Sequence, residues 1–333
     1  MKENVEVKVE AEGQRRSILR RGNKASSQKT FRREALIFCY LCMLIPLVQW
    51  LVFWLYVNVQ TIMLAFKNPL TDQWDFKVNF IWLWRTQVHI DPTSLRYEQS
   101  LMKAFENTMI FFGIRLFFTL PMSVVIAYFI YKKIWGYKVF RLAFYLPAVV
   151  PSLVMTTVCQ QITQSGGILD KMFNCIPLGG LLENPATARG TLIVYVLLCS
   201  FTTNVLLFSG GMARVPMEVI EAAKLDGVGP FQEIIFLIIP LIWPTVTTQI
   251  ILAFTNMFDG GGPVLLLTQG RNGTTTLAFW LFYQIAGTGR TAIPDGGPGV
   301  YRVSAVGLIL TAIAVPIVLI VRKIFDKVEP VEY

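Results

Sequence analysis

The chain has 333 residues, of which 54% are hydrophobic and only 15% are charged, and its formal net charge is +9. A soluble domain carries roughly 25% charged residues, so this composition excludes an ordinary water-soluble globule. It also excludes a disordered chain and a disulfide scaffold, because those classes need more polar residues or more cysteine. A protein that crosses a membrane several times remains.

The first 34 residues contain ten Lys and Arg side chains and no apolar run. We expect residues 1–34 to form a basic cytoplasmic arm that determines topology and contacts anionic lipid. No cleavable signal peptide is expected, because its apolar core would have to begin near the start of the chain. Phe31 is the only aromatic residue in the basic cluster, so the stacking surface that nucleic-acid binding needs is missing.

Six stretches are long and apolar enough to cross a bilayer as helices, which takes about 20 residues each. They predict an all-α integral membrane protein with a membrane domain over 35–325 and a cytoplasmic tail over 326–333. The expected spans are at about 35–58, 107–130, 143–163, 191–209, 240–258 and 303–321. The apolar stretch from Leu277 to Ile285 is too short to span, so we expect an outer-surface or re-entrant helix there; a seventh span is the alternative.

The distribution of basic residues predicts the orientation. If the N-terminus is cytoplasmic, the inner segments hold 19 Lys and Arg residues and the outer loops hold 10, with Arg115 inside a span. The loop over 131–141 is decisive, because it carries four basic residues and no acidic one. Both termini are therefore expected in the cytoplasm, and the net charge is mainly topological.

Residues that carry catalysis or bind metals are scarce. The chain has a single histidine, His89, and the Cys39-x-x-Cys42 pair falls inside a span, where packing is the expected role. No metal ligand set, no catalytic residue and no cofactor bound by this chain are expected. The composition favours a transport protein over an enzyme.

A polar segment over 211–239 is predicted to lie on the cytoplasmic side, between spans four and five. Pro216 suits the first turn of a helix, and Gly227 suits the position after a helix end. Gly229-Pro230 then starts a second short helix. The expected structure is a helix, a sharp turn and another helix that protrude from the membrane; an interfacial helix that only lies on the bilayer is the alternative.

This segment resembles the EAA loop of permease subunits of ATP-binding-cassette importers. The family pattern is EAA, three residues, Gly, nine residues, then Ile, any residue, Leu and Pro. Here it reads Glu221-Ala222-Ala223, Gly227 and Leu237-Ile238-Ile239-Pro240, so only Leu237 and Ile239 depart from the pattern. The resemblance implies the type I importer permease fold with six spans.

Further short sequence motifs are similar to those of the carbohydrate branch of these permeases. Members of this branch import sugars delivered by an extracellular binding protein. The motifs are Glu106-Asn107-Thr108, Phe144-Tyr145-Leu146-Pro147 with Pro151, Leu225-Asp226-Gly227, and Phe258-Asp259 with Gly260-Gly261-Gly262-Pro263. The resemblance therefore implies that the substrate is a sugar, expected to be an oligosaccharide.

The resemblance also implies partners in a prokaryotic plasma membrane: a second permease, two ATPase subunits and an extracellular or periplasmic solute-binding protein. ATP and Mg are expected on the ATPase, because the dipeptide Gly-Lys of a phosphate-binding loop does not occur in this chain. In the family, the EAA helix sits in a cleft of the ATPase. The expected ATPase-coupling residues are Glu221, Ala222, Ala223, Asp226, Gly227 and Pro240.

Polar residues inside spans are costly, so they are candidates for the substrate pathway. In the family the sugar lies against spans four and five, and the candidates there are Ser200, Thr203, Asn204, Asn256 and Asp259. The alternative is that such side chains join helices or bond to their own backbone. Arg115 either reaches the outer interface or pairs with an acid such as Asp259, or it lines the pathway and favours an anionic sugar.

Alternative functions stay open. A permease of the same superfamily for peptides, amino acids or polyamines is the nearer one. A secondary transporter is more distant, since it would show internal repeats and an ion relay inside the membrane. The loop over 286–300 is rich in Gly and Pro, and we expect disorder there, with docking of a binding protein as the alternative.

Overall fold

The structure is a computed structural model that describes residues 34–88, 100–173, 180–259, 264–286 and 297–327. The chain divides into two compact units, residues 1–63 and 64–333. Several predicted features lie outside the described residues: the arm up to residue 33, the glycine run at 260–263, most of the loop over 286–300 and the tail from residue 328.

The first unit is described from Glu34 onward, where one helix begins that runs to Ala65. This helix contains a π-helical stretch, η1 (Trp50–Tyr56), and ends with α2 (Val57–Ala65). An 18-residue window of this helix has a mean hydropathy of 2.3. Its 32 residues reach about 48 Å, which exceeds the hydrocarbon thickness of about 30 Å. The helix is therefore longer than the span predicted over 35–58.

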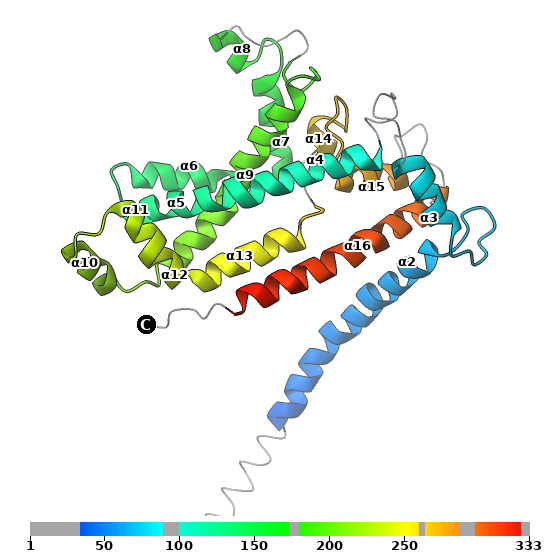
Figure 1. The fold of residues 1–333 in the computed structure, drawn as a ribbon, viewed down its shortest axis with the longest axis horizontal. Coiled ribbons are helices and arrows are strands. Elements are labelled where there is room, and N and C mark those ends of the chain that lie inside the picture. The colour runs from blue at the N-terminus through cyan, green and yellow to red at the C-terminus, as the bar shows by residue number, and fades with distance from the viewer. Residues whose placement is uncertain (1–33, 89–99, 174–179, 260–263, 287–296, 328–333) are drawn as a thin grey trace, which may run out of the picture. The chain divides into compact units, whose positions relative to one another are not determined.

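The second unit is helical in its described part, apart from an isolated antiparallel bridge between Lys67 and Trp74 (Figure 1). Its elements in chain order are α3 (Val78–Leu83), η2 (Trp84–Val88), α4 (Leu101–Ile114), η4 (Arg115–Thr119), α5 (Leu120–Tyr131), α6 (Tyr137–Val149), α7 (Ser152–Thr163), α8 (Ile168–Phe173), α9 (Ala188–Met212), α10 (Met217–Leu225), α11 (Pro230–Gln232), η5 (Glu233–Ile238), α12 (Ile239–Leu241), α13 (Trp243–Thr255), α14 (Val264–Leu267), α15 (Leu277–Ala286) and α16 (Gly297–Phe325).

The prediction of an all-α membrane protein is confirmed. Four helices of the described chain are long and apolar enough to span a membrane, and two bent helix pairs bring the number to six if each pair is one span. The four are Glu34–Ala65, Leu101–Tyr131, Ala188–Met212 and Gly299–Phe325. The apolar helix α15 has only 10 residues, which is too short to cross the bilayer.

Prolines explain both bent pairs. The stretch predicted as a span over 143–163 turns by 110° between α6 and α7, where Pro151 forces Val150 into an extended conformation. The stretch predicted over 240–258 turns by 80° between α12 and α13. Pro244 has no N–H to bond the Pro240 carbonyl, so the helix is interrupted at Ile242, which lies midway between the two prolines.

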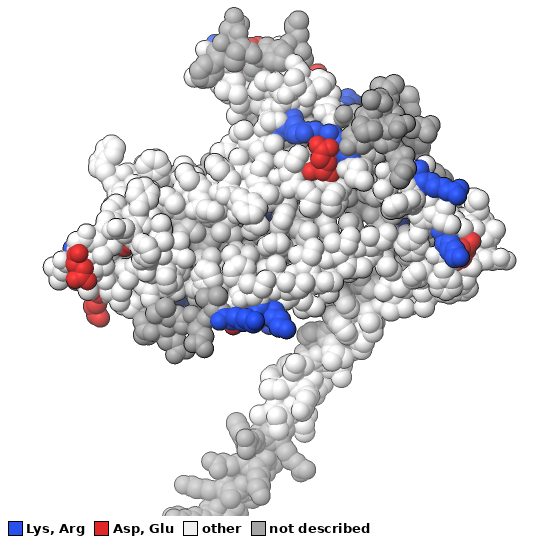
Figure 2. Space-filling view, in the orientation of Figure 1, with Lys and Arg blue, Asp and Glu red and all other residues white. Residues whose placement is uncertain are grey.

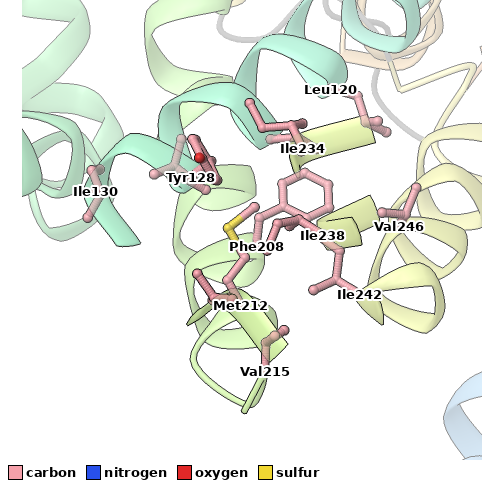
Figure 3. Close-up of a cluster of buried hydrophobic side chains, with 14 residues drawn as sticks. Leu120, Tyr128, Ile130, Phe208, Met212, Val215, Ile234, Ile238, Ile242 and Val246 are labelled. Carbon is pink, nitrogen blue, oxygen red and sulfur yellow. The ribbon is translucent and has the colours of Figure 1, made fainter. Parts of the chain in front are cut away.

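Buried apolar clusters join the helices of the second unit. The largest cluster packs Phe208 and Met212 of α9 against Ile234 and Ile238 of η5 and Ile242 (Figure 3). On the face shown in Figure 2, the charged side chains gather near the ends of the long helices and leave a broad uncharged band between them. Such a band is the surface expected to contact lipid tails.

Candidate functional site

The segment predicted as a helix, turn and helix forms α10 followed by a sharp turn. Pro216 is extended and directly precedes α10, and Glu218 lies in the first turn, where the helix dipole favours negative charge. After the helix, Gly227 takes φ +75°, and the Val228 N–H donates to the Ala223 carbonyl at 3.1 Å. This left-handed turn is one that glycine adopts with little strain, and it sets the direction in which the chain leaves α10.

Two opposite sides of α10 have different surroundings. Ile220 is 1% exposed and belongs to the apolar cluster that contains Phe208. Glu221 and Ala222 are exposed and Ala223 is half-buried. Among the described residues, Glu221 makes no ion pair or side-chain hydrogen bond. The helix is thus anchored on one side and open to a partner on the other.

The chain after the turn returns toward the helix bundle. Asp226 is exposed at the end of α10, and the Gly229 N–H donates to the Gln232 side-chain oxygen at 3.3 Å where α11 begins. The chain then continues through η5 into α12, in which Pro240 is half-buried. The expected coupling residues therefore fall into two groups: those around α10 are mostly exposed, and Pro240 lies at the bend before α13.

A buried carboxylate follows α11 directly. Glu233 is 3% exposed, and the Lys132 Nζ lies 2.7 Å from its carboxylate. The Tyr128 hydroxyl donates to the same carboxylate at 3.1 Å. From the sequence, Lys132 was expected only to determine topology, and Glu233 was not among the candidate residues. The signal that could have indicated Glu233 is its position directly before the apolar run 234–239, where an unpaired charge is costly. The ion pair joins the end of α5 to η5.

Three of the substrate-pathway candidates lie in the middle of α9. Thr203 is exposed, and Ser200 and Asn204 are half-buried. Their side chains make no hydrogen bond within the described chain, whereas Thr191 and Ser209 on the same helix donate to carbonyls four residues earlier. Bonding to the helix backbone, the expected alternative for such residues, therefore does not occupy these three.

The other two candidates on this side, Asn256 and Asp259, are both exposed and follow the last residue of α13. Helices α9 and α13 are in contact. Asn256 and Asp259 lie beyond an end of α13, while Ser200 lies in the middle of α9. The structure thus brings the two helices together, with three candidates in the middle of α9 and two beyond the last residue of α13.

Arg115 lies near the middle of the 31-residue helix Leu101–Tyr131, because this helix begins six residues before the predicted start at Asn107. It starts the π-helical turn η4, which contacts both α9 and α13. The side chain is half-buried, and within the described residues it forms no ion pair with Asp259 or any other acid. Single π-helical turns inside α-helices are frequent at functional sites.

The motif Glu106-Asn107-Thr108 has a structural role. The buried Asn107 amide donates to the carbonyls of Gly273 and Thr275, at 2.7 Å each. The Thr108 hydroxyl accepts from the Leu277 N–H at 2.9 Å. These bonds hold the turn before α15 against α4.

Comparison with known proteins gives one family and several relatives. The profile of the family described as binding-protein-dependent transport system inner membrane component matches residues 119–330. The maltose/maltodextrin transport system permease protein MalF of Escherichia coli (strain K12) is 28% identical over 207 residues, which are 60% of this chain and 40% of that protein. MalF of Photorhabdus laumondii is 29% identical over 211 residues, which are 61% and 40%. The chain thus spans about two fifths of the length of these curated relatives.

Two solved structures share the fold. One is a bacterial ABC transporter involved in the import of the acidic polysaccharide alginate, with a TM-score of 0.70, 20% identity and coverage of 90% of this chain and 98% of that chain. The other is the bacterial alginate ABC transporter in complex with an alginate pentasaccharide-bound periplasmic protein, with a TM-score of 0.68, 20% identity and coverage of 88% and 94%. The expected type I importer permease fold is confirmed. Because the family profile covers more than half of the sequence, the chain belongs to the binding-protein-dependent transport system inner membrane component family.

Proposed function

We propose that this chain is a permease subunit of an ATP-driven, binding-protein-dependent importer and forms half of the translocation pathway for an oligosaccharide. A second, related permease supplies the other half. Two ATPase subunits bind and hydrolyse ATP with Mg, and an extracellular or periplasmic solute-binding protein delivers the sugar. Both termini and α10 face the cytoplasm of a prokaryotic cell.

The observation that carries this proposal is the arrangement of α10, with Ile220 buried and Glu221 and Ala222 exposed. Small alanine side chains allow a partner to approach closely, and the Glu221 carboxylate can accept charge-assisted hydrogen bonds from an Arg or Lys. Movement of the ATPase displaces α10, and Ile220 passes this displacement to the apolar cluster of α9 and η5. The spans then alternate between inward- and outward-facing arrangements.

Replacing Glu221 by Arg tests the contact with the ATPase. A charge-assisted hydrogen bond contributes about 1.5–3 kcal/mol, so its loss weakens ATPase binding by roughly tenfold or more. We expect the ATPase to co-purify with the wild-type permease but not with Glu221→Arg. Glu218→Arg, which reverses another exposed charge on the same helix, serves as the control and keeps the ATPase. Normal ATPase binding by Glu221→Arg would contradict the proposal.

The sugar substrate is supported by the maltose/maltodextrin relatives and by the fold shared with alginate transporters. Ser200, Thr203 and Asn204 offer hydrogen-bonding groups that nothing in the described chain occupies. Arg115 adds a positive charge on the turn that contacts α9 and α13. These features favour an acidic oligosaccharide, such as a uronate oligomer.

Uptake by an Arg115→Gln variant tests this selectivity. We expect uptake of an acidic oligosaccharide by the reconstituted transporter to fall about tenfold, because a hydrogen-bonded charge pair is lost, while uptake of a neutral oligosaccharide is kept. Arg115→Lys retains the charge and is the control for the selectivity. Equal loss of acidic and neutral uptake in Arg115→Gln would show that Arg115 is structural.

A permease for peptides, amino acids or polyamines is the nearer alternative, and a secondary transporter is the more distant one. Arg115 disfavours polyamines, because a cation in the pathway repels a polycation. If unlabelled peptides, amino acids or polyamines inhibit sugar uptake, the nearer alternative is supported. Uptake driven by an ion gradient without ATP would indicate the second.

A further inference from the structure

A cavity of about 560 Å³ lies between α5, α6, α9 and α10. Its volume falls within the roughly 300–1,000 Å³ of ligand-binding sites. Four basic residues line it, and no Asp or Glu does. In the proposed orientation, this end of the helix bundle lies at the cytoplasmic leaflet of the membrane.

Three of these four cations lack an anionic partner. Lys132 is neutralised by Glu233, at 2.7 Å. Lys133, Arg141 and Lys224 form no ion pair in the part of the chain that the structure describes. The Arg141 guanidinium lies 5.4 Å from the centre of the Tyr145 ring. The cavity therefore carries a positive charge that the described protein does not compensate.

The remaining lining combines hydrogen-bond donors with apolar groups. Tyr131, Tyr137 and Tyr145 line the cavity, and their hydroxyl groups make no hydrogen bond within the described residues. Tyrosine hydroxyls, guanidinium and ammonium groups all donate to phosphate oxygens. Ile130 and Leu206 provide an apolar wall. This combination suits a molecule with a phosphate at one end and hydrocarbon at the other.

The surface beside the cavity has the character of a membrane interface. Trp135 is 98% exposed, and Val139 and Leu142 at the start of α6 are exposed as well. In sequence, Lys133 lies two residues before Trp135, and Lys138 lies between Trp135 and Val139. Exposed tryptophan together with basic residues is typical of the headgroup level of a bilayer, on the side where positive charges gather.

We propose that the cavity binds the headgroup of an anionic phospholipid of the cytoplasmic leaflet. Lys133, Arg141 and Lys224 contact the phosphate, and an acyl chain covers the apolar wall. A free phosphate ion shares the headgroup chemistry but leaves that wall bare. Because Lys224 belongs to α10, the bound lipid connects this helix to α6. This proposal rests on the orientation in the membrane given under the proposed function. Lipid binding can be measured without transport, so the two proposals are tested separately.

Lipid binding to the complete, delipidated transporter tests the site. Bound phosphatidylglycerol and phosphatidylcholine are counted by native mass spectrometry as each lipid is added. The site variant is Lys133→Gln/Arg141→Gln. The matched control is Lys138→Gln/Arg214→Gln, which removes the same charge from exposed residues that do not line the cavity. Thermal unfolding of both variants shows whether they are folded. If the site variant is not folded, Lys224→Gln is used in its place.

We expect the wild type and the control to retain phosphatidylglycerol in preference to phosphatidylcholine. Each basic residue near anionic lipid contributes a factor of about five, so the site variant should bind phosphatidylglycerol roughly 25-fold more weakly. Unchanged affinity in the site variant, or an equal loss in the control, would overturn the proposal. Displacement by inorganic phosphate at equal concentration would assign the cavity to a free anion and overturn the lipid site. Lost transport with intact lipid binding would count against the proposed function alone.

Discussion

Glu233 and Lys132 form an ion pair between positions that are 101 residues apart in the chain. The pair lies beside the apolar cluster that also holds Ile220 of α10. A carboxylate in such a place is tolerated because Lys132 and the Tyr128 hydroxyl compensate for the water it has lost. These side chains fix the end of α5 to η5, the element through which the chain returns from α10.

Removing only one member of the pair should destabilise the protein. Lys132→Met leaves the Glu233 charge buried and should lower the free energy of unfolding by about 2 kcal/mol. This is less than the roughly 3–5 kcal/mol of a fully buried pair, because the Lys132 side chain is 21% exposed. Lys132→Met/Glu233→Met removes both charges and should recover most of the loss. The thermal unfolding midpoint of the purified transporter measures both effects, and a double variant less stable than Lys132→Met would contradict the role of the pair.

At the scale of elements, hydrogen bonds made by side chains of α4 hold the turn that precedes α15. The Asn107 amide bonds the carbonyls of Gly273 and Thr275, and Thr108 accepts from the N–H of Leu277. Leu277 and Trp280 then pack in an apolar cluster with Ala104 of α4 and Val306 of α16. Because α15 is too short to span the membrane, this packing and these hydrogen bonds hold it in place.

Variants of Asn107 test this attachment. Asn107→Ala leaves two buried carbonyls without their donor, which should cost about 2 kcal/mol or more. Asn107→Asp should cost more than Asn107→Ala, because its carboxylate repels the same carbonyls. Hydrogen exchange should accelerate over residues 268–277 and stay unchanged in α10, which is the internal control. An unchanged exchange rate in the turn would show that Asn107 does not hold it.

The elements that sequence predicts are those set by local properties. The length of an apolar stretch can be read from the local sequence. Accordingly, α9 and α16 contain the spans predicted over 191–209 and 303–321. The bends have local causes as well, since Pro151 and Pro244 interrupt their helices, but the stretches over 143–163 and 240–258 were predicted as unbroken spans. The π-helical turn at Arg115 and the Lys132–Glu233 pair were not predictable. Both depend on which helices pack together, as the contacts of η4 with α9 and α13 illustrate.

At the scale of the whole second unit, one apolar cluster connects α10 to the helices that carry the pathway candidates. Ile220 of α10 belongs to the same buried cluster as Phe208 of α9, Ile238 of η5 and Val246 of α13. Close-packed interiors are not very compressible, so a displacement at one end is transmitted. Movement of α10 should therefore change the positions of α9 and α13.

The ratio of sugar taken up to ATP hydrolysed, measured in vesicles that contain the complete transporter, tests this transmission most directly. Gly227 has φ +75°, whereas proline is fixed near −65°. Gly227→Pro also removes the N–H that donates to the Lys224 carbonyl at 3.1 Å. The variant should therefore change the direction of the turn after α10 while leaving the spans intact. Gly227→Asn, which tolerates the left-handed conformation, is the matched control.

We expect Gly227→Pro to assemble in the membrane and to hydrolyse ATP, while sugar uptake falls to near background and the ratio collapses. Gly227→Asn should keep a ratio close to that of the wild type. A wild-type ratio in Gly227→Pro would contradict the role of α10 as the element that couples ATP hydrolysis to transport.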